Sequence, residues 1–185
     1  MALETTEIHN KLIATFGDSV FNFTQDHDIF SFEVPADKIS AVMLFLKNDE
    51  ILRFNFLTDL CAIHYPDNAL SRQFVMVYHM HNWYENVRIK IKAALDGENP
   101  EIKSVSNIFL CANWMERETY DFYGINFIGH PQLKRILNMD EMVSFPMRKE
   151  FPMEDEGRTD KDDRFFGRTK SNQPLDEEMF PIIKI

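Results

Sequence analysis

A predicted helix and the chain reversal after it occupy Asn113-Trp-Met-Glu-Arg-Glu-Thr-Tyr-Asp-Phe-Tyr-Gly-Ile-Asn-Phe-Ile-Gly-His-Pro-Gln-Leu-Lys-Arg-Ile-Leu137. Asn113, with Glu116 three residues later, has the pattern of a capping box, so we expect the helix to begin there. Gly124 favours the left-handed conformation that ends a helix. The proline after His130 biases that histidine toward an extended conformation and indicates a corner.

Charged residues share one side of this predicted helix. At about 100° per residue, Arg117, Glu118 and Asp121 fall within a sector of about 100°, which Trp114 joins. Arg117 and Asp121 stand four residues apart, and we expect Arg117 partly to neutralise the two acids. An ionic stripe beside apolar residues predicts a helix that bridges the core to a second protein surface.

Two other interpretations fit the same charges. One is a solvated face whose charges pair with one another. The other is catalysis, with Glu116, Glu118 or Asp121 as acid or base and His130 nearby. No nucleophile, phosphate-binding loop or metal-ligand spacing accompanies these residues in the sequence, so an interface is the favoured interpretation.

The rest of the chain predicts the fold around this helix. Apolar periodicity and turn residues indicate helices at 1–16, 35–47 and 104–110, and strands at 19–23, 28–34, 53–65, 72–83 and 86–95. The last strand alternates cleanly, with Val87, Ile89 and Ile91 on one side, which indicates a sheet with one buried face. We therefore expect an α+β fold: a mostly antiparallel sheet packed with helices, followed by the motif helix and an extended C-terminal arm.

Two parts of the chain differ in character. Residues 1–150 are expected to form the α+β domain, including the motif at 113–137, and residues 151–185 an extended arm that binds a partner. The stretch 153–164 is too polar to offset the entropy of ordering by burial. The arm nevertheless ends in the apolar run Met179-Phe-Pro-Ile-Ile-Lys-Ile185, which favours ordering on a partner.

Composition limits the classes of function. A net charge of −10 over 185 residues argues against binding to nucleic acid and to anionic lipid. No apolar run approaches the roughly 20 residues of a membrane-spanning helix, and the acidic N-terminus is unlike a targeting signal. We expect a cytoplasmic chain that meets a membrane only through protein partners. Two cysteines are fewer than the four thiolates of an iron–sulfur cluster.

Several stretches of the chain form a recognisable set: Glu116–Leu137, Leu57-Thr-Asp-Leu60, Tyr65-Pro66, Phe74-Val-Met-Val-Tyr-His79, Val105-Ser-Asn-Ile-Phe109 and Pro146-Met-Arg-Lys-Glu-Phe-Pro152. Together they resemble one protein family, the thirty-kilodalton subunit (designated C) of the proton-pumping NADH-quinone oxidoreductase, respiratory complex I. Gln132 and His64 stand where the family usually has acids.

The resemblance implies a cofactor-free scaffold in the peripheral arm of the complex. FMN and iron–sulfur clusters would lie on partner subunits, which carry electrons from NADH to quinone coupled to proton translocation. The implied partners are chiefly the large subunit designated D, with those designated B and I nearby, on the cytoplasmic side of the inner membrane. No catalytic, cofactor-binding or metal-binding residue is expected on this chain. We expect partner contacts at Glu116, Arg117, Glu118, Asp121, His130, Arg135, Arg148 and Lys149.

Two alternatives remain open at this point. Within the same class, the chain would be the homologous subunit of a membrane-bound hydrogenase. In a different class, it would be a freestanding acid/base enzyme that uses Glu118, Asp121 and His130. The enzyme predicts a pocket that contains all three side chains, with strongly shifted pKa values.

Overall fold

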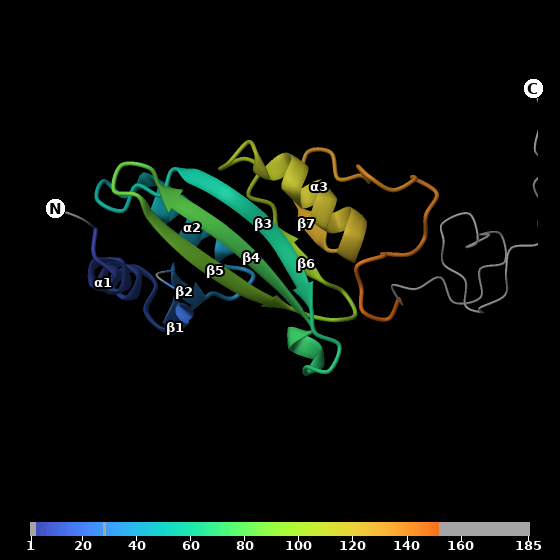
Figure 1. Ribbon diagram of the computed structural model, residues 1–185, viewed down its shortest axis with the longest axis horizontal. Helices are drawn as coiled ribbons and strands as arrows, with labels where there is room; N and C mark the ends of the chain where they lie inside the picture. The colour runs from blue at the N-terminus through green and yellow to red at the C-terminus, as the bar shows by residue number, and fades with distance from the viewer. Residues whose placement is uncertain (1–2, 28, 152–185) are drawn as a thin grey trace, which may run out of the picture. The chain divides into compact units, whose positions relative to one another are not determined.

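The computed structural model describes residues 3–27 and 29–151, which fold around one five-stranded sheet (Figure 1). The helices are α1 (Thr5–Phe16), α2 (Ile39–Asn48) and α3 (Ala112–Tyr123), with short 3-10 turns η1 (Gly17–Ser19) and η2 (Leu70–Arg72). The strands are β1 (Phe21–Asp26), β2 (Ile29–Glu33), β3 (Phe56–His64), β4 (Phe74–Asn82), β5 (Val87–Leu95), β6 (Glu101–Lys103) and β7 (Asn126–Ile128).

The main sheet has the strand order β1-β2-β5-β4-β3. Adjacent strands in this sheet are antiparallel, except that β2 and β5 run parallel to each other. Parallel neighbours need a crossover, and here α2 and the β3–β4 hairpin lie between the two strands in the chain. The predicted α+β fold with a mostly antiparallel sheet is confirmed, and so is the β1–β2 hairpin.

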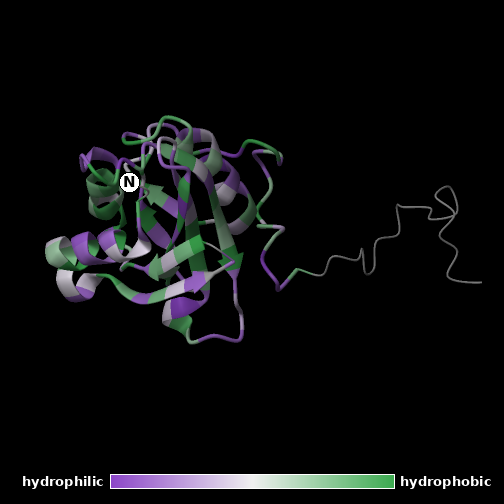
Figure 2. Ribbon diagram, turned by 60° about the vertical axis from the view of Figure 1, so that its left-hand side comes forward, coloured by the Kyte–Doolittle hydropathy of each residue, from purple (hydrophilic) through white to green (hydrophobic). Residues whose placement is uncertain are grey.

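The two faces of the sheet differ. In β5 the side chains of Ile89, Ile91 and Ala93 are fully buried, and the residues before and between them are basic. The buried face packs against α2, whose Val42 and Met43 are also fully buried. Figure 1 shows α2 behind the sheet, and among the described elements no helix crosses the face turned to the viewer. Figure 2 shows the alternation of hydrophobic and hydrophilic residues along the strands.

Three details differ from the predictions. The predicted helix at 104–110 is wrong: this segment forms turns, and the backbone N–H of Val105 points to a side chain of α3. Strands β6 and β7 were not predicted, because three residues are too short to show alternation; they pair in parallel, with Ile102 opposite Phe127. Helix α2 begins at Ile39, four residues after the proline that suggested its start.

The predicted arm, apart from Phe151, lies outside the described residues. Within the described part of the chain, no helix combines the length and apolar character needed to span a membrane.

Candidate functional site at helix α3

Helix α3 lies along β3, the edge strand of the main sheet (Figure 1). It begins at Ala112 without a side-chain cap, so the predicted capping box at Asn113 is wrong. Its predicted end is confirmed: Gly124 has φ 73° and ψ 25°, and its N–H donates to the Tyr120 carbonyl at 2.8 Å. The left-handed glycine turns the chain back toward the domain.

Glu116 points into the protein and holds the loop before α3. Its side chain is fully buried. Oε1 accepts the Val105 N–H at 2.7 Å, and Oε2 lies 2.6 Å from the Ser104 hydroxyl, which also contacts the Ser106 hydroxyl at 2.8 Å. Burial raises the pKa of Glu116 to about 7, although the hydrogen bonds from Ser104 and Val105 oppose the shift. The carboxyl therefore carries its proton close to neutral pH.

His130 lies beside Glu116 but does not neutralise it. Its Nε2 is 3.9 Å from Glu116 Oε2 and 3.1 Å from the Asn113 carbonyl. Its Nδ1 accepts the Gln132 N–H at 3.0 Å. Because Nδ1 accepts a hydrogen bond, the proton belongs on Nε2, which donates it to the carbonyl, and the ring is neutral. Glu116 is therefore buried without a full positive charge against it.

Asp121 is also fully buried, but it is densely partnered. Arg135 donates to Oδ1 at 2.7 Å, and the backbone N–H groups of Ile136, Leu137 and Asn138 donate to Oδ2 at 2.8–3.0 Å. Burial alone raises the pKa of Asp121, but these donors together outweigh it and hold the pKa well below its ordinary value. One carboxylate thus fixes the backbone of residues 135–138, which belong to the return segment, residues 130–151.

Arg117 does not pair with the acids of its own helix, and the prediction that it neutralises them is wrong. Its guanidinium donates to the carbonyls of Lys134 and Arg135, both at 3.1 Å. It also lies 5.1 Å from the centre of the Trp114 ring, which is 61% exposed. Glu118 is exposed. The countercharge of Asp121 comes instead from Arg135, fourteen residues further along the chain.

The last two predicted interface residues hold the end of the return segment. Arg148 donates from Nε to the Tyr123 carbonyl at 2.7 Å, and its guanidinium lies 5.1 Å from the centre of the Phe74 ring. The Lys149 N–H donates to Nδ1 of His64 at 3.0 Å, while the Lys149 residue is exposed. His64 in turn stacks on Phe74, with ring centres 4.4 Å apart.

The three residues of the alternative acid/base enzyme have separate surroundings. Glu118 is exposed, the Asp121 oxygens face the return segment, and both ring nitrogens of His130 are hydrogen-bonded to backbone groups. Across residues 3–27 and 29–151, no hydrogen bond joins any two of the three. In the same residues, no group of three His, Cys, Asp or Glu side chains is placed to hold a metal ion.

The return segment carries an exposed apolar surface that the sequence did not predict. Leu137, Met139 and Val143 are 64%, 74% and 94% exposed, and we call them the apolar strip. The three residues share no helical or strand periodicity, so the sequence does not assign them to an element. Their position among acidic and polar residues was the available sequence indication that they are exposed. Met147 and Phe151 continue the exposed apolar surface toward the end of the described chain.

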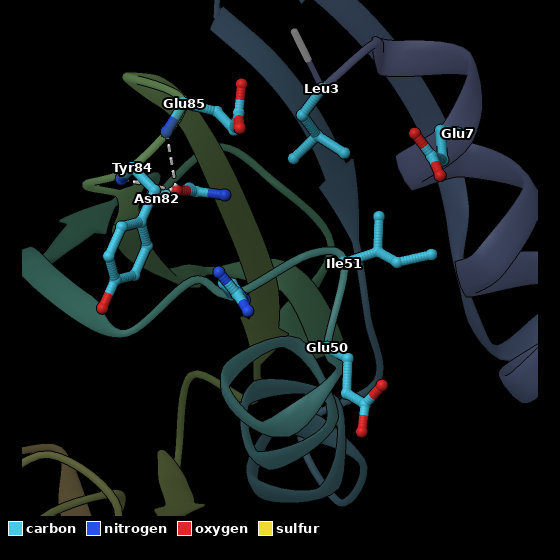
Figure 3. A pocket seen from close by; sticks show the side chains of 8 residues that line it. Leu3, Glu7, Glu50, Ile51, Asn82, Tyr84 and Glu85 are labelled. Atoms are coloured by element: carbon cyan, nitrogen blue, oxygen red, sulfur yellow. Dashed lines mark hydrogen bonds between the residues drawn. The ribbon is translucent and has the colours of Figure 1, made fainter. Parts of the chain in front are cut away.

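A pocket elsewhere in the domain contains none of the predicted site residues. It has a volume of about 310 Å³ and is lined by Leu3, Glu7, Glu50, Ile51, Arg53, Asn82, Tyr84 and Glu85 (Figure 3). The Asn82 Oδ1 at its wall accepts the N–H groups of Tyr84 and Glu85, as the dashed lines show. None of the residues that line the pocket belongs to α3 or to the return segment, so the pocket is separate from the site at α3.

Comparison with known proteins identifies the family to which the chain is similar. The family model for the respiratory-chain NADH dehydrogenase 30 Kd subunit matches residues 32–157. The NADH-quinone oxidoreductase subunit designated C 2 in Rhizobium meliloti is 41% identical over 143 residues, which are 77% of this chain and 76% of the relative. The NADH-quinone oxidoreductase subunit designated C in Moorella thermoacetica is 42% identical over 130 residues, 70% of this chain and 84% of that protein.

Two solved structures share the fold. A trypsin-resistant fragment of Nqo5 superposes with a TM-score of 0.58 and 24% identity, covering 68% of this chain and 98% of the fragment. A chain of the membrane-bound sulfane sulfur reductase, an archaeal respiratory membrane complex, has a TM-score of 0.71 at 21% identity and covers 95% of this chain and 98% of that one. With the family match over two thirds of its length, the chain belongs to the family of the 30 kDa subunit of respiratory-chain NADH dehydrogenase, the subunit designated C in NADH-quinone oxidoreductases.

Proposed function

We propose that this chain is a cofactor-free scaffold subunit in the peripheral arm of an NADH-quinone oxidoreductase. One observation carries the proposal: the apolar strip is held outward by a buried charged anchor, Asp121 with Arg135. Apolar surface that stays exposed in a fixed place usually marks a binding site. FMN and the iron–sulfur clusters lie on partner subunits, and this chain supplies no catalytic group.

The interface combines the apolar strip with the outer side of α3. Trp114, Arg117, Glu118 and Lys149 supply aromatic and charged groups around it, and aromatic and arginine side chains are enriched among the residues that dominate binding. Five of the eight predicted interface residues act behind this surface. Their side chains hold the loops in place from within the domain: Glu116, Asp121, His130, Arg135 and Arg148.

The partners we infer are chiefly the large subunit designated D, with those designated B and I nearby. We propose that the arm, residues 151–185, also binds a partner subunit. We infer that this chain is a peripheral membrane protein on the cytoplasmic side of the inner membrane, attached through the complex. The net charge of −10 supports attachment through proteins rather than through anionic lipid.

The test replaces the apolar strip without disturbing the anchor. Val143→Asp and Leu137→Asp variants of the tagged full chain are expressed together with the other subunits, and the complex is purified and its subunits identified by mass spectrometry. We expect incorporation to fall by about tenfold or more, because a charge at a desolvated contact costs several kcal/mol. Thermal unfolding of the isolated variants should match the original chain. Leu70→Asp, at a leucine that is 47% exposed in η2, is the matched control.

Two results would overturn the proposal. One is normal incorporation of both strip variants. The other is an isolated chain that purifies with bound flavin or an iron–sulfur cluster, or that oxidises NADH alone.

A second candidate comes from the fold shared with a chain of the membrane-bound sulfane sulfur reductase. In that case the chain would be the equivalent subunit of a related membrane-bound complex, such as a hydrogenase. The same purification separates the two candidates, because only the first brings down NADH-binding and flavin-binding subunits.

A further inference from the structure

The face of the main sheet that points away from α2, here called the open face, is built from four cross-strand rows. The register places these side by side across β3, β4 and β5: Ile63–Val75–Ala94, Cys61–Val77–Lys92, Asp59–His79–Lys90 and Phe56–His81–Arg88. These residues alternate along β4 and β5 with the buried residues that face the core. In Figure 1 this is the face turned to the viewer, and no helix among the described elements covers it.

The open face carries apolar residues on β3 and β4 and basic residues on β5. A sheet face that only meets water is usually polar. Here β3 and β4 contribute an apolar patch at one end of the face, formed by Ile63, Val75, Cys61 and Val77. Ile63 is 38% exposed and Val77 is buried, and Asp59 and His79 follow in the next row. Neighbouring side chains in a row lie about 5 Å apart, so the four residues of the apolar patch form one continuous surface.

A basic column stands beside it on β5. Arg88, Lys90 and Lys92 follow one another on the same side of that strand, in a chain whose net charge is −10. Within residues 3–27 and 29–151, the ion pairs of lysine and arginine involve Lys11, Lys38, Arg72, Arg135 and Arg148 but none of these three. The column is thus available to an acidic partner.

The spacing of the column indicates the shape of that partner. Every second residue of an antiparallel strand advances about 6.8 Å, so the column from Arg88 to Lys92 spans about 14 Å. Four residues of an α-helix advance about 6 Å. A helix lying along β5 with acids four residues apart would therefore place successive carboxylates near successive cations, and its apolar side would face Val75 and Ile63 of the apolar patch.

We propose that the open face is a second docking surface, which binds an amphipathic helix of another subunit with acidic residues on one side and apolar residues on the other. This inference rests on the proposed function, because it takes the partner to be a subunit of the same complex. It is separate from the apolar strip, which the return segment presents beyond α3.

Chemical labelling of the full-length chain, free and in the purified complex, tests the proposal. Acetic anhydride at limiting dose reports the accessibility of each lysine amine, and a carbodiimide joins amines to carboxylates within contact distance. We expect acetylation of Lys90 and Lys92 to fall by about fivefold or more in the complex. We also expect carbodiimide links from these amines to one segment of another subunit, at acids spaced four residues apart.

Charge reversal gives an independent measurement. The Lys90→Glu/Lys92→Glu double variant should enter the complex at least about fivefold less well than the original chain, with the same melting temperature when isolated. The Lys38→Glu/Lys103→Glu double variant carries the same change in net charge at exposed positions outside the open face, and it should enter normally.

Several outcomes would overturn the inference. They are equal acetylation in the free and assembled chain, carbodiimide links only to residues 152–185 of the same chain or to a second copy, and equal loss of incorporation in both double variants. If the original chain itself fails to join the other subunits, the proposed function fails instead.

Discussion

Replacing Glu116 with glutamine should stabilise the isolated chain at alkaline pH and leave it nearly unchanged in acid. The carboxyl is fully buried, and its neighbours offer hydrogen bonds from Val105 and Ser104 but no full positive charge. Glutamine can accept the same N–H through its oxygen and donate to the Ser104 hydroxyl through its amide. The variant therefore keeps the hydrogen bonds and removes the charge.

The magnitude follows from the pKa. The unfolded chain ionises Glu116 near its ordinary value of 4.5, whereas the folded chain retains the proton until about pH 7. The protonated carboxyl therefore favours the folded state fully below 4.5, and this stability is lost as the pH rises through 7. At about 1.4 kcal/mol per pKa unit, the whole loss amounts to about 3 kcal/mol.

Urea denaturation followed by circular dichroism measures this effect. Between about pH 5 and pH 8, the unfolding free energy of the Glu116→Gln variant should gain about 2–3 kcal/mol relative to the original chain. Glu118→Gln, at an exposed acid of the same helix, is the control and should follow the original chain at each pH. Parallel pH profiles for the original chain and the Glu116→Gln variant would refute the reasoning, because they would mean that the buried carboxylate is ionised and compensated in the folded state.

Other substitutions test the remaining contacts. Gly124→Ala should destabilise the chain by about 2–4 kcal/mol in thermal unfolding, because φ is +73° and a Cβ would lie 2.5 Å from the Phe145 ring; Gly129→Ala, with φ +85° and open space, should cost about 1–2 kcal/mol. Asp121→Asn should lower the free energy of unfolding by about 2–4 kcal/mol near neutral pH, and hydrogen exchange at the amides of residues 136–138 should become faster. Because the folded-state pKa of Asp121 is lowered, that difference should shrink only as the pH falls below 3.8. Tyr78→Phe should leave stability unchanged or raise it by about 1 kcal/mol, because the buried hydroxyl has no hydrogen-bond partner in the described residues; a clear loss in urea denaturation would contradict this.

Local pattern predicted the parts of the fold that depend on neighbouring residues. The alternation of β5 identified its buried face, and Gly124 marked the end of α3, because each signal depends on a few adjacent positions. The partner of Asp121 could not be predicted in this way. Helical spacing predicts Arg117, four residues away, as the countercharge, yet its guanidinium donates to backbone carbonyls. Arg135 pairs with Asp121 instead, from a turn whose path depends on the tertiary structure. The spacing of Asn113 and Glu116 likewise predicts a helix cap, because local spacing is all that the sequence shows. Nothing in the sequence indicates that Glu116 binds the loop at 104–106.

The orientation of α3 explains why two of its acids, Glu116 and Asp121, are buried although they are not in the apolar core stripe. Glu116 and Asp121 are five residues apart and point about 140° away from each other around the helix. Glu116 therefore reaches the loop at 104–106 on one side, and Asp121 reaches residues 135–138 on the other. The helical pattern placed Asp121 in the sector that leaves the core, and the structure agrees, but the first layer over that sector is the chain's own return segment. The ionic groups thus set the path of this segment, and the surface left for a partner is the outer side of that layer, where the apolar strip lies. Because the Asp121–Arg135 pair lies beneath this surface, breaking it should weaken partner binding by altering the conformation of residues 135–143. Hydrogen exchange at the amides of these residues should therefore be faster already in the isolated chain, without any partner present.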